Sequence, residues 1–129
     1  MDFDLVNTPP PISFNAPLAH KICEFYKKVY LLSKKIAKRD RYGIYSKIEN
    51  ISLEALTLVL QAALEIKPNK LSILNNARIK IEILKRLFRI TNELKIIQDK
   101  AYFKIEADLQ EMSKMTNGWI KYLKIENTA

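Results

Sequence analysis

Few residues in this chain could carry out catalytic chemistry, and their spacing does not bring them together. His20 is the only histidine and Cys23 the only cysteine among 129 residues, so a histidine-based metal cluster is impossible. Glu106 and Asp108 stand two positions apart, which points their side chains to different sides of a helix. The chain also lacks a glycine-rich phosphate loop, a nucleophile elbow and an inward Glu-x-x-His pair. We therefore expect no enzyme, no metal and no cofactor.

Basic residues are the more informative group. The chain has 22 Lys and Arg against 14 Asp and Glu, a net charge of +8 and a pI near 9.6. Such a balance is typical of proteins that bind acidic partners, usually nucleic acid, although a lysine-rich surface also serves solubility. The candidate phosphate-binding residues are Lys34, Lys35, Lys38, Arg39, Arg41, Arg78, Lys85 and Arg89. They would contact the backbone and shape of a nucleic acid, not its base sequence.

The first five of these residues fall in "SKKIAKRDRYG", at a corner between two expected helices. Cations are also favoured there by the exposed carbonyl groups at the end of a helix. The basic corner therefore has two explanations, helix-end charge complementarity and a phosphate-binding rim, and the sequence leaves both open.

Apolar residues recur at steps of three and four in four segments, which predicts four amphipathic helices. The expected helices cover residues 18–38, 40–66, 70–97 and 99–124. Asp40, Asn69 and Asp99 are expected to start helices, and Pro68 to stop one. Short turns between such helices favour an all-α, up-down-up-down antiparallel four-helix bundle over residues 18–129.

Residues 1–17 differ from the rest of the chain. This stretch, "MDFDLVNTPPPISFNAP", holds four of the five prolines, with Asp2 and Asp4 but no Lys or Arg. It cannot form a regular helix or a central strand, so we expect an extended tail. A mobile terminus is the favoured interpretation. The alternative is that its apolar residues dock on a neighbouring surface; they are Phe3, Leu5, Ile12 and Phe14.

The second expected helix is apolar on two faces. One row contains Ile48, Ile51 and Ala55, and a second row contains Leu53, Leu56, Leu60 and Leu64. A helix that is apolar nearly all round is buried on more than one side. In so small a protein, this pattern suggests contact with another subunit.

Gly118 precedes the only tryptophan, Trp119, in "MTNGWIKYL" near the end of the fourth helix. A glycine within a helix costs about 1 kcal/mol relative to alanine, so we expect a compensating role. Close approach of a neighbouring helix to Gly118 is the favoured explanation, with Trp119 anchoring the end of the bundle or a subunit contact. The alternative is that Gly118 ends the helix as a C-cap.

The chain carries no sign of a secreted or membrane protein. Its first residues are acidic and run into prolines, unlike a signal peptide. The longest apolar stretch, residues 51–66, is interrupted by Glu54, Gln61 and Glu65, so it is not a membrane span. A single cysteine packed among Ile22 and Phe25 fits a buried thiol in a reducing compartment. We expect a soluble, cytoplasmic protein.

Two stretches together resemble a known family. "KRDRYGIYSKIE" and "LQEMSKMTNGWIKYL" are similar to a family of small bacterial four-helix bundle proteins. Its best-known branch is Avd, the accessory variability determinant of diversity-generating retroelements, and a sister branch is encoded by 23S ribosomal RNA intervening sequences. The likeness covers residues 20–124 and excludes the proline-rich tail. "KMTNGW" departs from the usual pattern, since relatives have an apolar pair and a second small residue before the tryptophan.

The resemblance implies a function that the periodicity does not show. Proteins of the Avd branch form homopentameric barrels with a positive surface, bind a reverse transcriptase and its template RNA or cDNA, and have no catalytic activity. The family's basic positions fall on Lys38, Arg39, Arg41, Lys85 and Arg89, and its closing signature on Gly118 and Trp119.

We therefore expect a non-catalytic, nucleic-acid-binding, homopentameric accessory protein of a retroelement reverse transcriptase. Two alternatives stay open. One is a protein of the intervening-sequence branch that binds ribosomal RNA. The other is a purely structural oligomer whose charge only maintains solubility.

Overall fold

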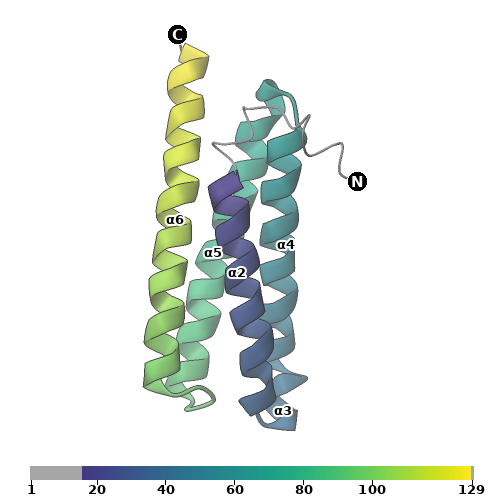
Figure 1. Cartoon of the computed structure of the whole chain (residues 1–129), viewed down its shortest axis with the longest axis vertical. Coiled ribbons are helices and arrows are strands. Elements are labelled where there is room, and N and C mark those ends of the chain that lie inside the picture. The colour runs from purple at the N-terminus through teal and green to yellow at the C-terminus, as the bar shows by residue number, and fades with distance from the viewer. Residues whose placement is uncertain (1–15, 129) are drawn as a thin grey trace.

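The fold is a bundle of four long helices, described by a computed structural model for residues 16–128 (Figure 1). Its elements are α2 (Ala16–Leu32), the 3-10 helix η2 (Ser33–Lys35), the four-residue α3 (Lys38–Arg41), α4 (Ile44–Leu64), α5 (Lys67–Glu93) and α6 (Asp99–Thr128). No strand occurs in this range. The expected all-α four-helix bundle is therefore confirmed. Within the same range, no helix is long and apolar enough to span a membrane.

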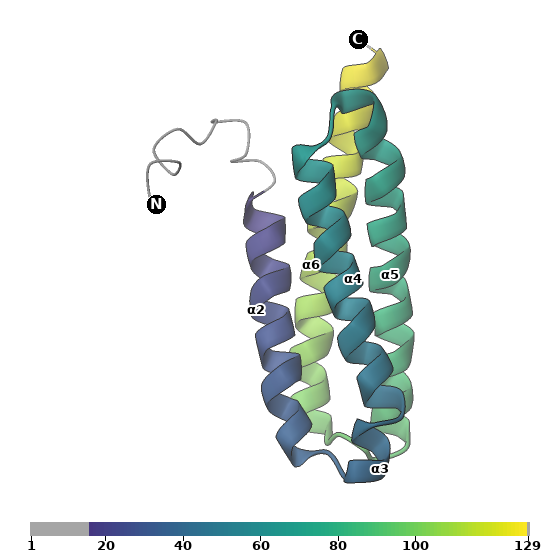
Figure 2. The same cartoon turned by 90° about the vertical axis from the view of Figure 1, so that its right-hand side faces the viewer.

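The long helices alternate in direction along the chain (Figures 1 and 2). Helix α2 packs against α4 and α6, and α5 packs against the same two helices from the other side. The α2–α4 connection (residues 33–43) and the α5–α6 turn (residues 94–98) consequently lie at the same end of the bundle. We call this the two-turn end. The start of α2 and the end of α6 lie at the opposite end.

The core follows most of the predicted stripes, and it also contains four apolar residues outside them: Tyr45, Val59, Ile97 and Ile120. Leu18, Ile22, Phe25 and Val29 of α2 are almost completely buried, as expected from their spacing. Tyr45 is fully buried and donates a hydrogen bond of 2.6 Å to the Val29 carbonyl oxygen. That bond satisfies the buried hydroxyl group and ties the start of α4 to α2.

Contacts between aromatic rings join α2 and α4 to α5 in the centre of the bundle. The rings of Tyr45 and Phe25 each meet Phe88 of α5 edge to face, at centroid distances of 6.3 and 6.1 Å. Such pairs add about 0.5–1.5 kcal/mol beyond area burial. Three helices are thus joined through Phe88.

The first helix is shorter than predicted. It was expected to reach residue 38, but α2 ends at Leu32, and Ile36 has an extended backbone (φ −95°, ψ 135°) with a 4% exposed side chain. The extended backbone turns Ile36 into the core, and this burial compensates for the lost helical hydrogen bonds. The prediction also placed Pro17 in the tail, whereas it lies in the first turn of α2, a position that suits proline. Residues 1–15, the rest of the expected tail, lie outside the described residues.

The start of the second long helix was also predicted wrongly. Asp40 lies within α3 and does not cap α4; the N-cap is Gly43. A Cβ atom at position 43 would lie 3.1 Å from the Arg39 carbonyl oxygen. The tight corner therefore favours glycine, because a side chain here would have to displace this backbone oxygen by a few tenths of an ångström.

Helix α5 begins and ends earlier than residues 70–97. It starts at Lys67, with Pro68 in its first turn. It ends at Glu93, and Lys95 adopts a left-handed conformation (φ 63°). The Ile96 amide donates to the Thr91 carbonyl at 2.8 Å, and the Lys95 amide to Asn92 at 3.0 Å. This pair of bonds is a Schellman motif, in which the left-handed position is usually glycine. Helix α6 then begins at Asp99, as predicted.

Gly118 does not have the expected close neighbour. Helix α6 continues through it to Thr128, so it is not a C-cap either. A Cβ atom built at Gly118 meets no atom within 4 Å, so no described helix of the same chain approaches it. Trp119 is 3% exposed and packs in the core. A subunit contact at Gly118 stays a prediction.

Replacing Gly118 with alanine tests what covers this position. In an uncovered helix interior, Gly118→Ala should raise the free energy of unfolding by about 1 kcal/mol, through helix propensity alone. Urea unfolding followed by circular dichroism would measure the change. Lys121→Ala, on the same exposed helix surface, is the control and should be nearly neutral. Destabilisation by Gly118→Ala would instead indicate that another subunit lies against the glycine.

Candidate nucleic-acid interface

The basic corner predicted from the sequence, residues 34–41, lies at the two-turn end. Lys34, Lys35, Lys38 and Arg39 are exposed, on η2 and α3. The Arg41 guanidinium lies 5.6 Å from the ring centroid of Tyr42, which holds the group at the surface through a cation–π contact. The five corner residues therefore lie together, as their closeness in sequence predicts.

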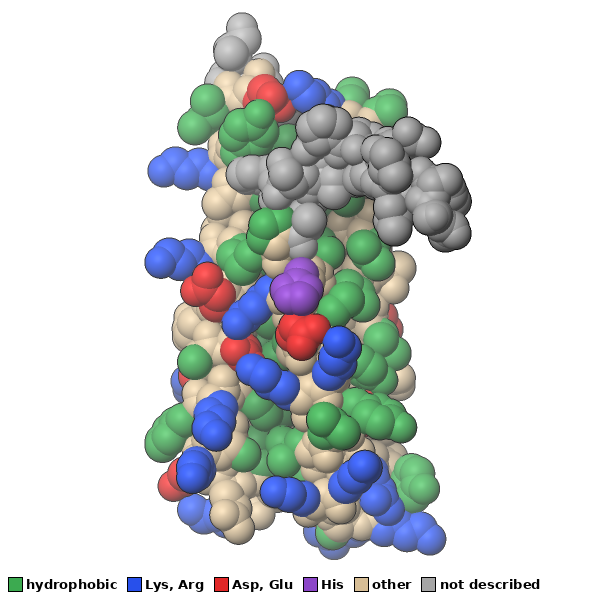
Figure 3. All heavy atoms as spheres, in the orientation of Figure 1, with side chains coloured by type: hydrophobic (Ala, Val, Ile, Leu, Met, Phe, Trp, Pro, Cys, Tyr) green, Lys and Arg blue, Asp and Glu red, His purple; other side chains and the backbone are tan. Residues whose placement is uncertain are grey.

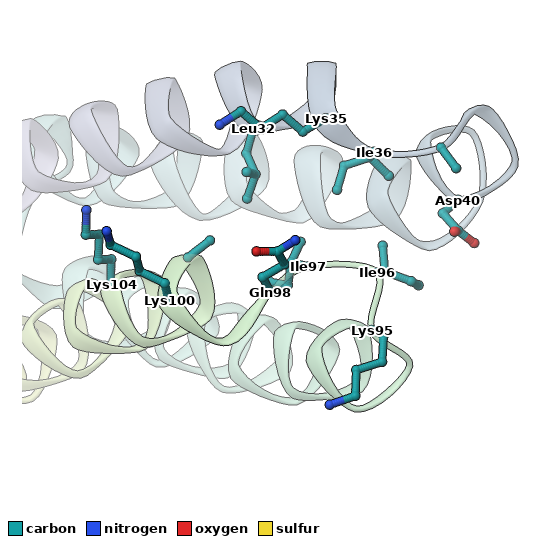
Figure 4. Close-up of a pocket in the computed structure, with 12 residues that line it drawn as sticks. Leu32, Lys35, Ile36, Asp40, Lys95, Ile96, Ile97, Gln98, Lys100 and Lys104 are labelled. Carbon is teal, nitrogen blue, oxygen red and sulfur yellow. The ribbon is translucent and has the colours of Figure 1, made fainter.

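A groove of about 730 Å³ opens beside this corner, between the end of α2 and the start of α6. Its floor is apolar: Ile36 and Ile97 are 4% and 3% exposed, and Leu32 and Ile96 are half-buried. Lys35 lines the groove from η2, and Lys100 and Lys104 line it from α6. In Figure 4 the side chains of these lysines extend along the groove, whereas Lys95 points away from α2. We call this site the two-turn groove.

The sequence analysis missed Lys95, Lys100 and Lys104. It counted charges along continuous segments, and these lysines are about 60 residues away from the corner in sequence. A signal was present, because an up-down-up-down bundle puts the first and third turns at the same end. Applied to the predicted helices, that rule places residues near 98 beside residues near 39.

The basic residues of α5 lie elsewhere. The prediction treated Lys85 and Arg89 as an extension of the basic corner, but they line a separate hollow of about 250 Å³ between α5 and α6. Glu106 and Gln110 of α6 form its other wall. Positions 104 and 106 point to nearly opposite sides of α6, so α6 separates this hollow from the two-turn groove. Arg78 is half-buried, seven residues before Lys85 on α5.

One of the three cations that line the α5–α6 hollow, Lys85, is already paired with an acidic residue. Lys85 Nζ lies 3.1 Å from Glu82 Oε2, and the Lys85 side chain is only 21% exposed. Glu82 Oε2 also accepts a hydrogen bond of 3.4 Å from Ser113 of α6. Glu82 therefore offsets part of the positive charge on this side of α5. Arg86 and Arg89, which also line the hollow, are exposed.

Asp108 holds α2 against α6. Its carboxylate, 11% exposed, accepts hydrogen bonds from Lys21 at 3.0 Å and from Lys28 at 2.8 Å. Burial by itself would raise the pKa of Asp108, but the hydrogen bonds and charges of Lys28 and Lys21 outweigh it and lower the pKa below its ordinary value. Glu106 instead accepts hydrogen bonds from Gln110 and Tyr102. The two carboxylates therefore serve different faces, as their spacing predicts.

The lysines of the two-turn end differ from Lys21 and Lys28 in having no acidic partner. Within residues 16–128, Lys34, Lys35, Lys38, Lys100 and Lys104 form no ion pair within 4.0 Å. The exception at the corner is Arg39, whose Nε lies 3.7 Å from Asp40 Oδ1. This end of the molecule therefore presents uncompensated positive charge, which an anion can neutralise.

The remaining chemical candidates are scattered. His20 is exposed, and Cys23 is half-buried, less than the fully buried thiol that we expected. Among the described residues, no group of three or more His, Cys, Asp or Glu side chains could hold a metal ion. The residues that do converge are cations around an apolar floor, an arrangement suited to binding.

These features define a basic four-helix bundle with a cationic groove at one end. Comparison with family models identifies the family: the bAvd-like model matches residues 18–123 of the chain. The chain therefore belongs to the bAvd-like family, which confirms the resemblance found in the sequence. No curated protein and no solved structure matches the chain.

The ion pairs of Asp108 give a stability prediction. Asp108→Asn should lower the free energy of unfolding at pH 7 by about 1–2 kcal/mol, because a nearly buried carboxylate with two lysine partners is lost. Because the folded pKa lies below the ordinary value of 3.8, the contribution of Asp108 is complete above that pH. It disappears as the pH falls through the folded pKa.

Urea unfolding of both proteins at pH 7, 5 and 2.5 would measure this. Glu111→Gln, an exposed change on the same helix, is the control and should leave stability unchanged. An equal loss for Asp108→Asn at pH 7 and pH 2.5 would contradict the ionic explanation.

Proposed function

We propose that this protein is a non-catalytic accessory subunit that binds nucleic acid together with a retroelement reverse transcriptase. Membership of the bAvd-like family supports the general role. The observation that carries nucleic-acid binding is the uncompensated charge of the two-turn end. Lys35 from the α2–α4 connection and Lys100 and Lys104 from α6 line one groove. Lys34 and Lys38 lie on the same connection as Lys35.

The arrangement of these lysines favours phosphate over base recognition. They are long, exposed side chains that come from three separate elements, and each can approach a different phosphate group. Lysine binds phosphate as a point charge, without the planar fork that arginine uses to recognise guanine. The protein should therefore bind with little sequence preference and strong salt dependence.

Replacing three lysines of the groove tests this proposal. The variant Lys35→Ala, Lys100→Ala, Lys104→Ala should weaken binding to a fluorescent single-stranded RNA in anisotropy titrations. It should also reduce the slope of log K against log salt by about two to three, because each lost phosphate contact removes about 0.7–0.9.

A matched control distinguishes binding in the groove from nonspecific attraction of RNA to the positive charge of the protein. Lys114→Ala, Lys121→Ala removes two exposed lysines from the more distant part of α6, and it should change the affinity much less. Equal effects per lysine in the two variants would indicate nonspecific electrostatics and reject the groove as the binding site. Lys85→Ala, Arg89→Ala should fall between them, because Lys85 is already paired with Glu82.

We further propose that the subunit assembles into a homopentameric ring. A ring needs two different surfaces on each subunit that fit one another. Most of the second apolar row of α4 is exposed, with Leu53 at 41%, Leu60 at 45% and Leu64 at 83%, whereas Leu56 packs against the core. Helix α5 has a separate exposed row of Ile79, Ile83 and Ile90, on a different side from Lys85 and Arg89. These rows support burial between subunits.

Light scattering on a sizing column tests the ring. We expect an absolute mass near 75 kDa, five times the 15.0 kDa of one chain. Leu53→Lys, Leu60→Lys should reduce the mass, because charge at these positions would be buried in the contact. A wild-type mass of 15 kDa would reject the ring and leave the four-helix fold unaffected.

A further inference from the structure

The two-turn groove has a cationic rim and an apolar floor, and a nucleic-acid backbone would contact only the rim. Its rim is cationic, but its floor is formed by Leu32, Ile36, Ile96 and Ile97, without an aromatic ring on which a base could stack. Figure 3 shows hydrophobic side chains bordered by Lys and Arg on the lower part of this face. A ligand that fits both properties has acidic and apolar groups in alternation.

One segment of this chain has that pattern. Residues 2–5, "DFDL", alternate the carboxylates of Asp2 and Asp4 with the apolar side chains of Phe3 and Leu5, and no Lys or Arg occurs before Lys21. In an extended segment, successive side chains point to opposite sides. Phe3 and Leu5 can therefore face the floor while both carboxylates face the lysines.

The segment is long enough to reach the groove of its own chain. From Ala16 to Lys35 the helical path covers about 29 Å at 1.5 Å per residue. The eleven residues from Leu5 to Ala16 span up to about 36–40 Å when extended. The prolines at positions 9–11 favour extended backbone, which keeps the span long and limits the entropy lost on docking.

We propose that residues 2–5 dock in the two-turn groove of the same chain and shield its lysines. Asp2 and Asp4 lie against Lys35, Lys100 and Lys104, and Phe3 and Leu5 cover Ile36 and Ile97. Asp40, the one described acidic residue that lines the groove, has its carboxylate turned toward the far end, away from Lys100 and Lys104 (Figure 4). Docking does not depend on the proposed function; its effect on nucleic-acid binding does.

Disulfide trapping tests the docking directly. In a Cys23→Ser background, Leu5→Cys is combined with Gln98→Cys, since Gln98 lines the groove. The control pair is Leu5→Cys with Lys47→Cys, an exposed position at the same end on α4. Trapping rates under mild oxidation are divided by the rate at which a small disulfide reagent modifies each cysteine, which corrects for thiol reactivity.

The proposal expects trapping in the Gln98 pair at least about tenfold faster than in the Lys47 pair, because docking raises the effective concentration. The product should run as a monomer on a non-reducing gel. Asp2→Asn, Asp4→Asn or 0.5 M salt should lower the rate toward the control. Equal rates in the two pairs would overturn the docking, and a product that runs as a dimer would overturn docking within one chain.

The effect on binding is measured separately. Phe3→Ser, Leu5→Ser removes the apolar contacts without changing charge, and it should tighten RNA binding by about three- to tenfold by exposing the lysines. Specific trapping together with unchanged RNA affinity would overturn the shielding and reject the groove as the nucleic-acid site, but it would leave the docking intact.

Discussion

The alternating direction of the four helices is the constraint on which the rest of this structure depends. Each helix has one nearly continuous apolar stripe, and these stripes are buried together only when neighbouring helices pack along their whole length. In an antiparallel bundle this brings residues 33–43 and residues 94–98 to the same end. The two-turn groove exists because of that arrangement. Its apolar floor is the last layer of the core, and its rim is formed by the side chains that surround this layer.

Charge is used in two different ways within one basic surface. Lys21 and Lys28 are held by Asp108 across the α2–α6 contact, and Lys85 is held by Glu82. These lysines contribute to the structure and have little charge left for a ligand. Among residues 16–128, Lys34, Lys35, Lys38, Lys100 and Lys104 at the two-turn end lack such partners, so their charge is available to an anion. A count of basic residues gives the net charge, but only pairing shows which cations can bind an anion.

Family membership and geometry support the proposed function from independent directions. The bAvd-like match covers residues 18–123, which includes the groove and both exposed apolar rows. It stops short of the acidic, proline-rich residues at the start of the chain. An intramolecular shield formed by those residues would make binding depend on competition between carboxylates and phosphates for the same lysines.

The sequence by itself determined the all-helical fold, most of the core and the basic corner, because helical periodicity and local charge are properties of nearby residues. It misplaced the ends of α2 and α5, since Ile36 leaves the helix to enter the core and Lys95 adopts a left-handed conformation at a position where glycine is usual. It predicted a packing partner for Gly118 that no described residue supplies. Only the tertiary structure decided that Lys100 and Lys104 join Lys35, while Lys85 and Arg89 face another hollow. These relationships depend on which helix faces are neighbours, and packing of the whole bundle fixes them.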